Sequence, residues 1–430
     1  MRSYGRRVLR ILCAAIVAVG AFLVYSVRAD ASTGIQFGVQ DDAWLLGGPG
    51  TFDERLDKVD ALGVDLVRVN VRWDQVGAKR PAKSADNLDP AYNWAAPDVL
   101  LNGLRARGIG AVVTLVGAPR WANGGRASNW APTSTSSFAN FAYAAATRYP
   151  WVRRWLIWNE PNKNWQLRPT SPATYTKVLL NPAYAALKRA NRANLVGGGV
   201  TAPRGGSGSV SPVDWIRGMD RAHARLDAYA HHPYPVSRFE TPNAGGCTRC
   251  ENITMADLDR LLTNVTRAFG RKRIWLTEYG YQTNPPDRFF GVSQATQARY
   301  LSEAALKAYH APYVDMLIHF LVRDEAHVGR WQSGLFTIND RAKLSAAAFP
   351  MPLARLSLRG STVTLWGQVR PGLGGQTYRL RYTTGHGWRW LGGNRRTSSR
   401  GFYVVKVRVP KRTTVQAFSN GALSAAVRVR

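Results

Sequence analysis

Residues 155–161 read Trp-Leu-Ile-Trp-Asn-Glu-Pro: a short apolar run that ends at once in an amide, a carboxylate and a proline. In residues 274–280, Ile-Trp-Leu-Thr-Glu-Tyr-Gly, a short apolar run likewise leads to a carboxylate. Aromatic and β-branched side chains favour strands, and strands of a parallel sheet that is covered on both faces are apolar throughout. Both stretches therefore predict parallel strands whose carboxyl ends carry polar groups.

The sequence around these stretches alternates strand-like and helix-like segments from residue 35 to residue 321. The strand-like segments are short and apolar and lie at 35–39, 64–69, 111–116, 155–158, 195–199, 226–230, 274–277 and 314–320. Amphipathic segments typical of helices include 97–107, 136–148, 172–191, 255–269 and 293–309. Eight strands with helices between them predict an α/β fold, a (β/α)8 or TIM barrel. The alternative is a doubly wound open sheet, but such a sheet usually has a glycine-rich loop after its first strand. Here Gln40, Asp41 and Asp42 follow that strand.

The pattern changes near Phe349-Pro350-Met351-Pro352. Short alternating runs follow at 356–358, 362–366, 378–382, 402–409, 414–418 and 425–429. They predict a small antiparallel β-sandwich over residues 351–430, after a barrel over residues 32–350. Its Trp388 and Trp390 are candidates for stacking on sugar, and packing in the core is the competing interpretation.

The N-terminus has the features of an export signal. Four arginines within residues 2–10 precede an apolar run at 11–27, and Ala29-Asp30-Ala31 fits a cleavage site. We therefore expect residues 1–31 to be a signal peptide and the protein to be secreted. The alternative is an uncleaved anchor that holds the chain at the outer face of the cytoplasmic membrane.

Two cysteines remain beyond residue 31, Cys247 and Cys250. Zinc needs about four ligands, and the sequence offers no second cysteine pair. Glycines 245 and 246 mark a loop, whereas a thioredoxin-like motif opens a helix. In an exported chain, a local structural disulfide is the interpretation that we favour.

The formal net charge is +31, and most of the basic residues are arginine. The arginines are spread from Arg2 to Arg430 without an RNA-binding motif, so we expect no nucleic-acid partner. Two interpretations stay open: a general arginine bias, or attraction to an anionic cell-wall polymer or glycan.

Polar groups follow three of the expected barrel strands: Asn159 and Glu160, His232 and Tyr234, and Glu278. The carboxyl ends of barrel strands meet at one face, so these side chains should share one cleft. Two carboxyl groups in one cleft are what cleavage of a glycosidic bond requires, because one protonates the leaving oxygen and the other attacks the anomeric carbon.

Four residues are candidates for adjusting this pair or holding substrate. Arg68, near the end of the second strand, is positioned to hold Glu278 ionised, and Tyr234 to donate a hydrogen bond to it. Asn159 is a candidate for binding a sugar hydroxyl, and His232 for orienting either glutamate. A plain ion pair or a satisfied polar pair in the barrel mouth is the competing interpretation. By strand alternation, His231 should point into the barrel wall.

Residues 158–162, Trp-Asn-Glu-Pro-Asn, and 277–280, Thr-Glu-Tyr-Gly, resemble clan A glycoside hydrolases, especially families 5 and 39. Val67-Arg68-Val69 with Trp73, and His232-x-Tyr234, extend the resemblance, which covers residues 35–349. It implies a cellulase-type barrel with Glu160 as acid/base and Glu278 as nucleophile. It also implies a retaining hydrolase of O-glycosidic bonds in a poly- or oligosaccharide, without cofactor or metal.

The sequence departs from the family pattern after the eighth strand, where Phe320 and Leu321 stand in place of the usual tryptophan. Trp331 is the candidate replacement, and with Trp121 and Trp165 it is expected to stack on sugar or else to pack in the core. Two other functions stay open: a non-catalytic carbohydrate- or cell-wall-binding barrel, and a transglycosylase that uses the same two glutamates.

Overall fold

The structure is a computed structural model that describes residues 32–247 and 250–430. Eight parallel strands pair in chain order, and the last pairs with the first, so the sheet closes into a barrel. The strands are β1 (Gln36–Gln40), β2 (Leu66–Arg72), β3 (Gly110–Val116), β4 (Arg154–Ile157), β5 (Leu195–Thr201), β6 (Ala228–His231), β7 (Arg273–Tyr279) and β8 (Val314–Phe320). The predicted TIM barrel is confirmed, and the open sheet is excluded.

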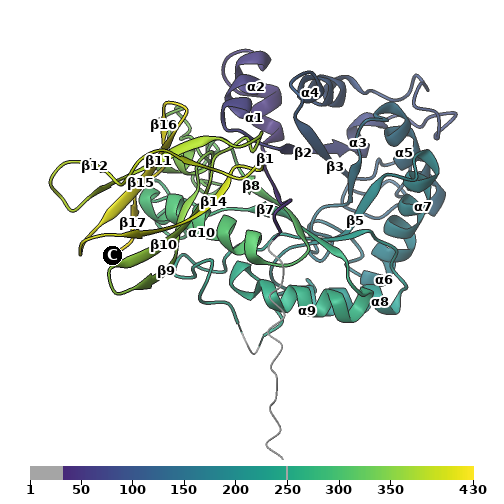
Figure 1. The fold of residues 1–430 in the computed structure, drawn as a ribbon. Helices are drawn as coiled ribbons and strands as arrows, with labels where there is room; N and C mark the ends of the chain where they lie inside the picture. Colours follow the sequence, from purple (N-terminus) through teal and green to yellow (C-terminus); the bar gives the residue numbers. More distant parts are fainter. Residues whose placement is uncertain (1–31, 248–249) are drawn as a thin grey trace, which may run out of the picture.

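Helices surround the barrel, as Figure 1 shows for α4, α5, α7, α8 and α9. The longer ones are α2 (Phe52–Ala61), α4 (Ala95–Ala106), α5 (Thr135–Arg148), α7 (Asn181–Ala190), α8 (Pro212–Arg221), α9 (Leu258–Phe269) and α10 (Gln294–His310). Short helical segments are α1 (Asp42–Gly47), α3 (Trp73–Val76), α6 (Pro172–Thr174), η2 (Met255–Asp257) and α11 (Leu344–Ala348).

The segment that we expected to be one helix, 172–191, is three consecutive pieces. A π-helical stretch, Tyr175–Leu180, separates α6 from α7. Pro182 stands in the first turn of α7 and has no N–H to donate to the preceding turn. The wider π-helical turn ahead of Pro182 keeps the chain helical. The spacing of apolar residues in the sequence does not reveal such a turn.

Strand alternation divides the barrel into an inner and an outer core. Leu66, Val112, Leu156, Trp275 and Ile318 belong to the cluster that fills the barrel interior. Their neighbours along the strands belong to the larger cluster formed with the helices. Position 68 of β2 therefore falls on the inner face, two residues beyond Leu66.

The C-terminal region forms antiparallel sheets, visible beside the barrel in Figure 1. One sheet contains β9 (Leu353–Arg359), β10 (Thr362–Gln368) and β14 (Phe402–Arg408). The other contains β11 (Thr377–Thr383), β12 (Arg389–Trp390), β13 (Arg395–Arg396), β15 (Thr414–Ser419), β16 (Ala422–Leu423) and β17 (Val427–Arg428). Leu365 of the first sheet and Leu380 of the second share one buried cluster. The two-residue strands β12, β13 and β16 were not expected, because so short a segment shows no period, whereas β17 lies within the expected run 425–429.

An aromatic cluster of Tyr309, Trp366 and Phe402 joins α10 of the barrel to the C-terminal sheets. Asp65 and Arg400 lie across the same junction, 3.6 Å apart. The boundary at residue 350 between two folding units stays a prediction.

Cys247 and Cys250 form a disulfide. The predicted signal peptide, residues 1–31, lies outside the described residues. Within the described ranges, no helix has both the length and the apolar character needed to cross a membrane.

Candidate active site

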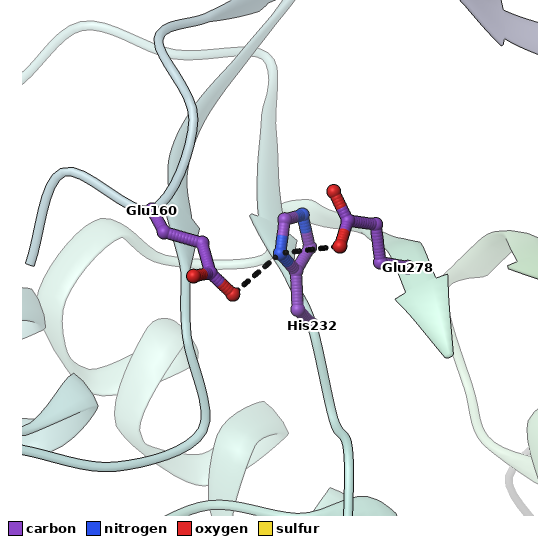
Figure 2. A group of neighbouring side chains, drawn as sticks. All are labelled: Glu160, His232 and Glu278. Atoms are coloured by element: carbon purple, nitrogen blue, oxygen red, sulfur yellow. Dashed lines mark hydrogen bonds and ion pairs between the residues drawn. The ribbon is translucent and has the colours of Figure 1, made fainter. Parts of the chain in front are cut away.

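The two glutamates singled out by sequence lie together in the barrel mouth, on either side of His232. Glu160 follows β4, His232 follows β6, and Glu278 lies near the end of β7. One side-chain atom from each of the three lies within 4.8 Å of the others. Figure 2 shows the imidazole between the two carboxylates, with dashed lines to both.

A register shift in β7 brings Glu278 into this mouth. Trp275 faces the barrel interior and Leu276 the outer core, so strict alternation would turn residue 278 outward. Between Leu276 and Tyr279, however, β7 has an extra residue relative to β8. A bulge of this kind turns the side chain that follows it to the other face.

Two donors hold the carboxylate of Glu278. The Nη1 atom of Arg68 lies 2.6 Å from its Oε1, and the hydroxyl of Tyr234 lies 3.0 Å from its Oε2. Burial, followed by the nearby Glu278, raises the pKa of Tyr234 well above its usual value, so the phenol stays protonated and donates. Charge-assisted hydrogen bonds of this kind stabilise a carboxylate in its ionised form.

Arg68 is itself fixed in orientation. Its side chain is fully buried, and Nε donates to the Thr114 hydroxyl at 2.9 Å. Its Nη2 donates to Oδ1 of Asn159 at 2.7 Å, and Nη1 also reaches the carbonyl of Thr277 at 3.1 Å. One guanidinium thus connects β2, β3 and β7 with the segment after β4, and it sets the position of the amide beside Glu160.

Glu160 has different surroundings. Its side chain is 17% exposed and accepts a hydrogen bond from Nδ1 of His232 at 3.1 Å. Burial raises its pKa to about 7, while the positive charges of Lys163, Arg68 and Arg204 oppose that rise. A carboxyl group with such a pKa is protonated in about half of the molecules at neutral pH and releases that proton readily. The backbone of Glu160 has a φ of 41°, and that of Trp158 a φ of 67°, in the left-handed region that residues other than glycine avoid.

The protonation of His232 follows from its neighbours. Nη1 of Arg68 lies 3.2 Å from Nε2, and an arginine can only donate, so Nε2 must be the acceptor. Burial lowers the pKa of His232 to about 3, and the ring is neutral at ordinary pH. The single ring proton is therefore on Nδ1, where it is donated to Glu160.

Glu160, His232 and Glu278 have the residue types and the spacing of a metal site. Their protonation does not suit a metal ion, because Nδ1 carries the proton and has no lone pair to offer. The guanidinium of Arg68, 2.6 Å from Glu278, adds a positive charge where a cation would bind. The set therefore suits proton transfer and nucleophilic attack rather than metal ligation.

A cleft of about 270 Å³ opens beside Glu160 and Tyr234. Trp165, which is 58% exposed, and Trp331 form part of its wall, and the Trp331 ring lies 4.8 Å from that of Tyr234. Trp121 lies elsewhere. It borders a separate hollow with Arg80 and donates to the carbonyl of Gly77 at 2.7 Å. The structure therefore brings two of the three predicted tryptophans to the cleft.

A comparison with protein families matches residues 30–314 to the model of cellulase, glycosyl hydrolase family 5. The chain belongs to glycosyl hydrolase family 5. It is therefore an O-glycosyl hydrolase, and its substrate is a carbohydrate. A comparison with curated protein sequences gives no match.

Solved structures share the fold of this family 5 chain. A family 39 glycoside hydrolase from Bacteroides cellulosilyticus WH2 is 17% identical, with a TM-score of 0.59 over 94% of this chain and 80% of the other. A monomeric β-xylosidase from Caulobacter crescentus CB15 is 16% identical, with a TM-score of 0.57 over 89% and 94%. A GH5_18 structure from Streptomyces cattleya in complex with GlcNAc is 18% identical, with a TM-score of 0.52 over 74% and 79%.

Our sequence predictions for this family 5 site did not include several cleft residues. Lys163, Arg204 and Arg238 line the cleft beside Glu160. Asp42 and Asn70 line a second hollow of about 610 Å³, which also borders Asn159. Asn70 lies two residues beyond Arg68 in β2, so alternation would have placed it on the inner face. Arg204 comes three residues after the end of β5, and its position just after a barrel strand was an available signal.

Proposed function

We propose that this family 5 chain is a retaining glycosidase with Glu278 as nucleophile and Glu160 as acid/base. The observation that carries the proposal is the spacing, because an oxygen of each carboxylate lies within 4.8 Å of the other. Retaining enzymes hold their carboxyl groups about 5 Å apart, whereas inverting enzymes leave about 6.5–9.5 Å for a water molecule.

The assignment of roles is supported by the unequal surroundings of the pair. Glu278 is held by a guanidinium and a phenol, which favour the ionised carboxylate that a nucleophile needs. Glu160 has a pKa of about 7 and keeps a proton to donate. Two carboxyl groups whose environments separate their proton affinities are what this chemistry requires.

In the first step, a Glu278 oxygen attacks the anomeric carbon while the bond to the leaving oxygen breaks, and that oxygen takes the Glu160 proton. In the second step, ionised Glu160 removes a proton from water. The water oxygen then attacks the anomeric carbon and releases Glu278 as a carboxylate. The hydrogen bond from Nδ1 of His232 stabilises Glu160 while it is ionised between these steps.

Further parts of the proposal rest on the sequence pattern. We infer that the substrate is a poly- or oligosaccharide, with Arg68, Asn159, His232, Tyr234, Trp165 and Trp331 as binding or positioning residues. Residues 1–31 support export, and the disulfide of Cys247 and Cys250 is consistent with an oxidising compartment. A transglycosylase would use the same residues with a sugar acceptor in place of water.

The experiment is intact-protein mass spectrometry after incubation with a panel of 2-deoxy-2-fluoro glycosyl fluorides. These reagents trap the covalent intermediate of a retaining enzyme. We expect a mass gain of one fluoro sugar in the wild type and none in Glu278→Ala, and peptide mapping should place the label on Glu278. A label on another residue, or product of inverted configuration from a natural substrate, would contradict the proposal.

A further inference from the structure

The C-terminal sheets carry positive charge and have no aspartate or glutamate of their own. Residues 351–430 contain 13 arginines and two lysines but no aspartate or glutamate, and the last acidic residue of the chain is Asp340. A general arginine bias would add cations without removing every acid. Unneutralised like charges repel one another and oppose compact folding, and binding of a polyanion relieves that repulsion.

Part of this charge is arranged with aromatic rings on the outer side of one sheet. We call Arg379, Arg381, Trp388, Trp390 and Phe418 the Arg–Trp face. On β11, Arg379 and Arg381 alternate with Tyr378 and Leu380, which point into the buried core. The backbone pairs Arg381 with Trp390 and Arg379 with Phe418, so β11, β12 and β15 all contribute to it.

Each arginine of the Arg–Trp face lies over a tryptophan ring. The guanidinium carbon of Arg379 is 4.0 Å from the Trp390 ring centre, and that of Arg381 is 4.6 Å from the Trp388 ring centre. The Arg381 guanidinium is also held by Oε1 of Gln416, at 2.7 Å from Nη2. Stacking and hydrogen bonding limit the motion of these long side chains, so less conformational entropy is lost when a ligand binds.

The Arg–Trp face is open to a ligand. Trp388 and Trp390 are 40% and 47% exposed, which leaves parts of both rings accessible. Among the residues that the structure describes, neither Arg379 nor Arg381 forms an ion pair. A guanidinium offers a planar fork of N–H groups that matches carboxylate and phosphate oxygens, and an indole ring offers an apolar surface to the C–H groups of a sugar.

We propose that the Arg–Trp face binds an anionic polysaccharide, with its carboxylate or phosphate groups on the two arginines and its sugar rings against the two tryptophans. Membership of a glycoside hydrolase family favours a polysaccharide over nucleic acid as the polymer. The binding site lies outside the barrel mouth and does not depend on the roles of Glu160 and Glu278.

The test measures binding of residues 32–430 to polygalacturonate and to a glycosylated glycerol-phosphate polymer, with neutral dextran as the uncharged comparison. Comparison of the two anionic polymers shows whether the arginines bind carboxylate or phosphate groups. The variant Arg379→Gln/Arg381→Gln removes both charges from the face. Its matched control, Lys406→Gln/Arg408→Gln, makes the same change in charge at exposed positions of β14 in the other sheet.

We expect the wild type to bind at least one of the anionic polymers and not dextran. The Arg379→Gln/Arg381→Gln variant should bind about a hundredfold more weakly at low salt, about tenfold for each charge-assisted contact. Its slope of log affinity against log salt should be shallower by about two, since two fewer counterions are released. The control variant should stay within about threefold of the wild type, because its charges lie away from the face.

Folding is checked by thermal unfolding. If the glutamine variant does not fold, Arg379→Lys/Arg381→Lys replaces it. Lysine keeps the charge but lacks the planar fork, and we expect about tenfold weaker binding. Equal losses in the face and control variants would overturn the proposal, as would equal affinity for dextran. Tighter binding of double-stranded DNA than of either polymer would also overturn it.

Discussion

The surroundings of Glu278 and of Glu160 differ more than the similarity of the two side chains suggests. Glu278 lies on a strand, and its two carboxylate oxygens accept from Arg68 of β2 and from Tyr234, three residues after β6. Glu160 lies after a strand, with a left-handed backbone, and its carboxylate accepts from the neutral ring of His232. The part of the chain that the structure describes places no arginine or lysine within ion-pair distance of Glu160.

This difference shows how one barrel gives the same chemical group two electrostatic environments. A fixed positive charge in contact with a carboxylate favours the anion, and burial without such contact favours the neutral acid. Arg68 acts on both glutamates, since it contacts Glu278 directly and lowers the pKa of Glu160 only through its charge at longer range.

The largest expected effect comes from Glu278→Ala, which removes the group that we assign as nucleophile. Because no covalent intermediate can form, kcat should fall on the order of 10⁴-fold or more. With a dinitrophenyl glycoside and added azide, the variant should form the glycosyl azide of inverted configuration, identified by NMR. An azide product of retained configuration would contradict the assignment, because it would indicate that Glu278 is the acid/base and Glu160 the nucleophile.

Glu160→Ala should have a large effect that depends on the leaving group. The missing proton matters for a poor leaving group, where we expect a loss of about 10²–10⁴-fold in kcat/KM. It matters little for dinitrophenolate, which needs no protonation, so the first step should approach the wild-type rate. Measuring both substrates separates an acid/base from a binding residue, whose loss would affect them equally. Added azide should restore turnover of Glu160→Ala and give a glycosyl azide of retained configuration.

Arg68→Lys tests whether a positive charge alone accounts for the state of Glu278. A lysine has one nitrogen and cannot contact Glu278, Thr114 and Asn159 together. We expect kcat/KM to fall about a hundredfold and the free energy of unfolding to drop by about 2 kcal/mol, because the oxygens of Thr114 and Asn159 lose their donor. Tyr234→Phe, which removes one donor, is the milder comparison. If Arg68→Lys kept the wild-type kcat/KM and free energy of unfolding, a positive charge alone would be sufficient and the planar guanidinium would not be needed.

The smallest effect concerns the pH dependence. Glu160 must be protonated in the first step, and its pKa is about 7, so kcat/KM should fall as the pH rises through about 7. Arg204 opposes the rise of that pKa, and Arg204→Gln should therefore move the alkaline limb to higher pH by a fraction of a unit. Arg221→Gln, an exposed change on α8 with the same loss of charge, should leave the limb in place. A shift to lower pH in Arg204→Gln would contradict the electrostatic explanation.

The barrel was predictable because its pattern is local. Each strand is an apolar run buried on both faces, and each helix has an apolar side, so the order of elements can be read from short segments. The prediction failed where geometry departs from a regular period, as in the π-helical stretch of residues 175–180 and the two-residue strands at 389–390 and 422–423.

The sequence by itself determined the family, the eight-stranded barrel and the identity of the polar residues after its strands, since those depend on residue order and hydrophobic period. The tertiary structure alone decided how these residues meet. An extra residue in β7 turns Glu278 inward, contrary to alternation, and Arg68 fixes the tautomer of His232 from another strand. The pKa of Glu160 likewise depends on how completely distant segments bury it. Burial and cross-strand contacts are properties of the closed barrel, and no single segment contains them.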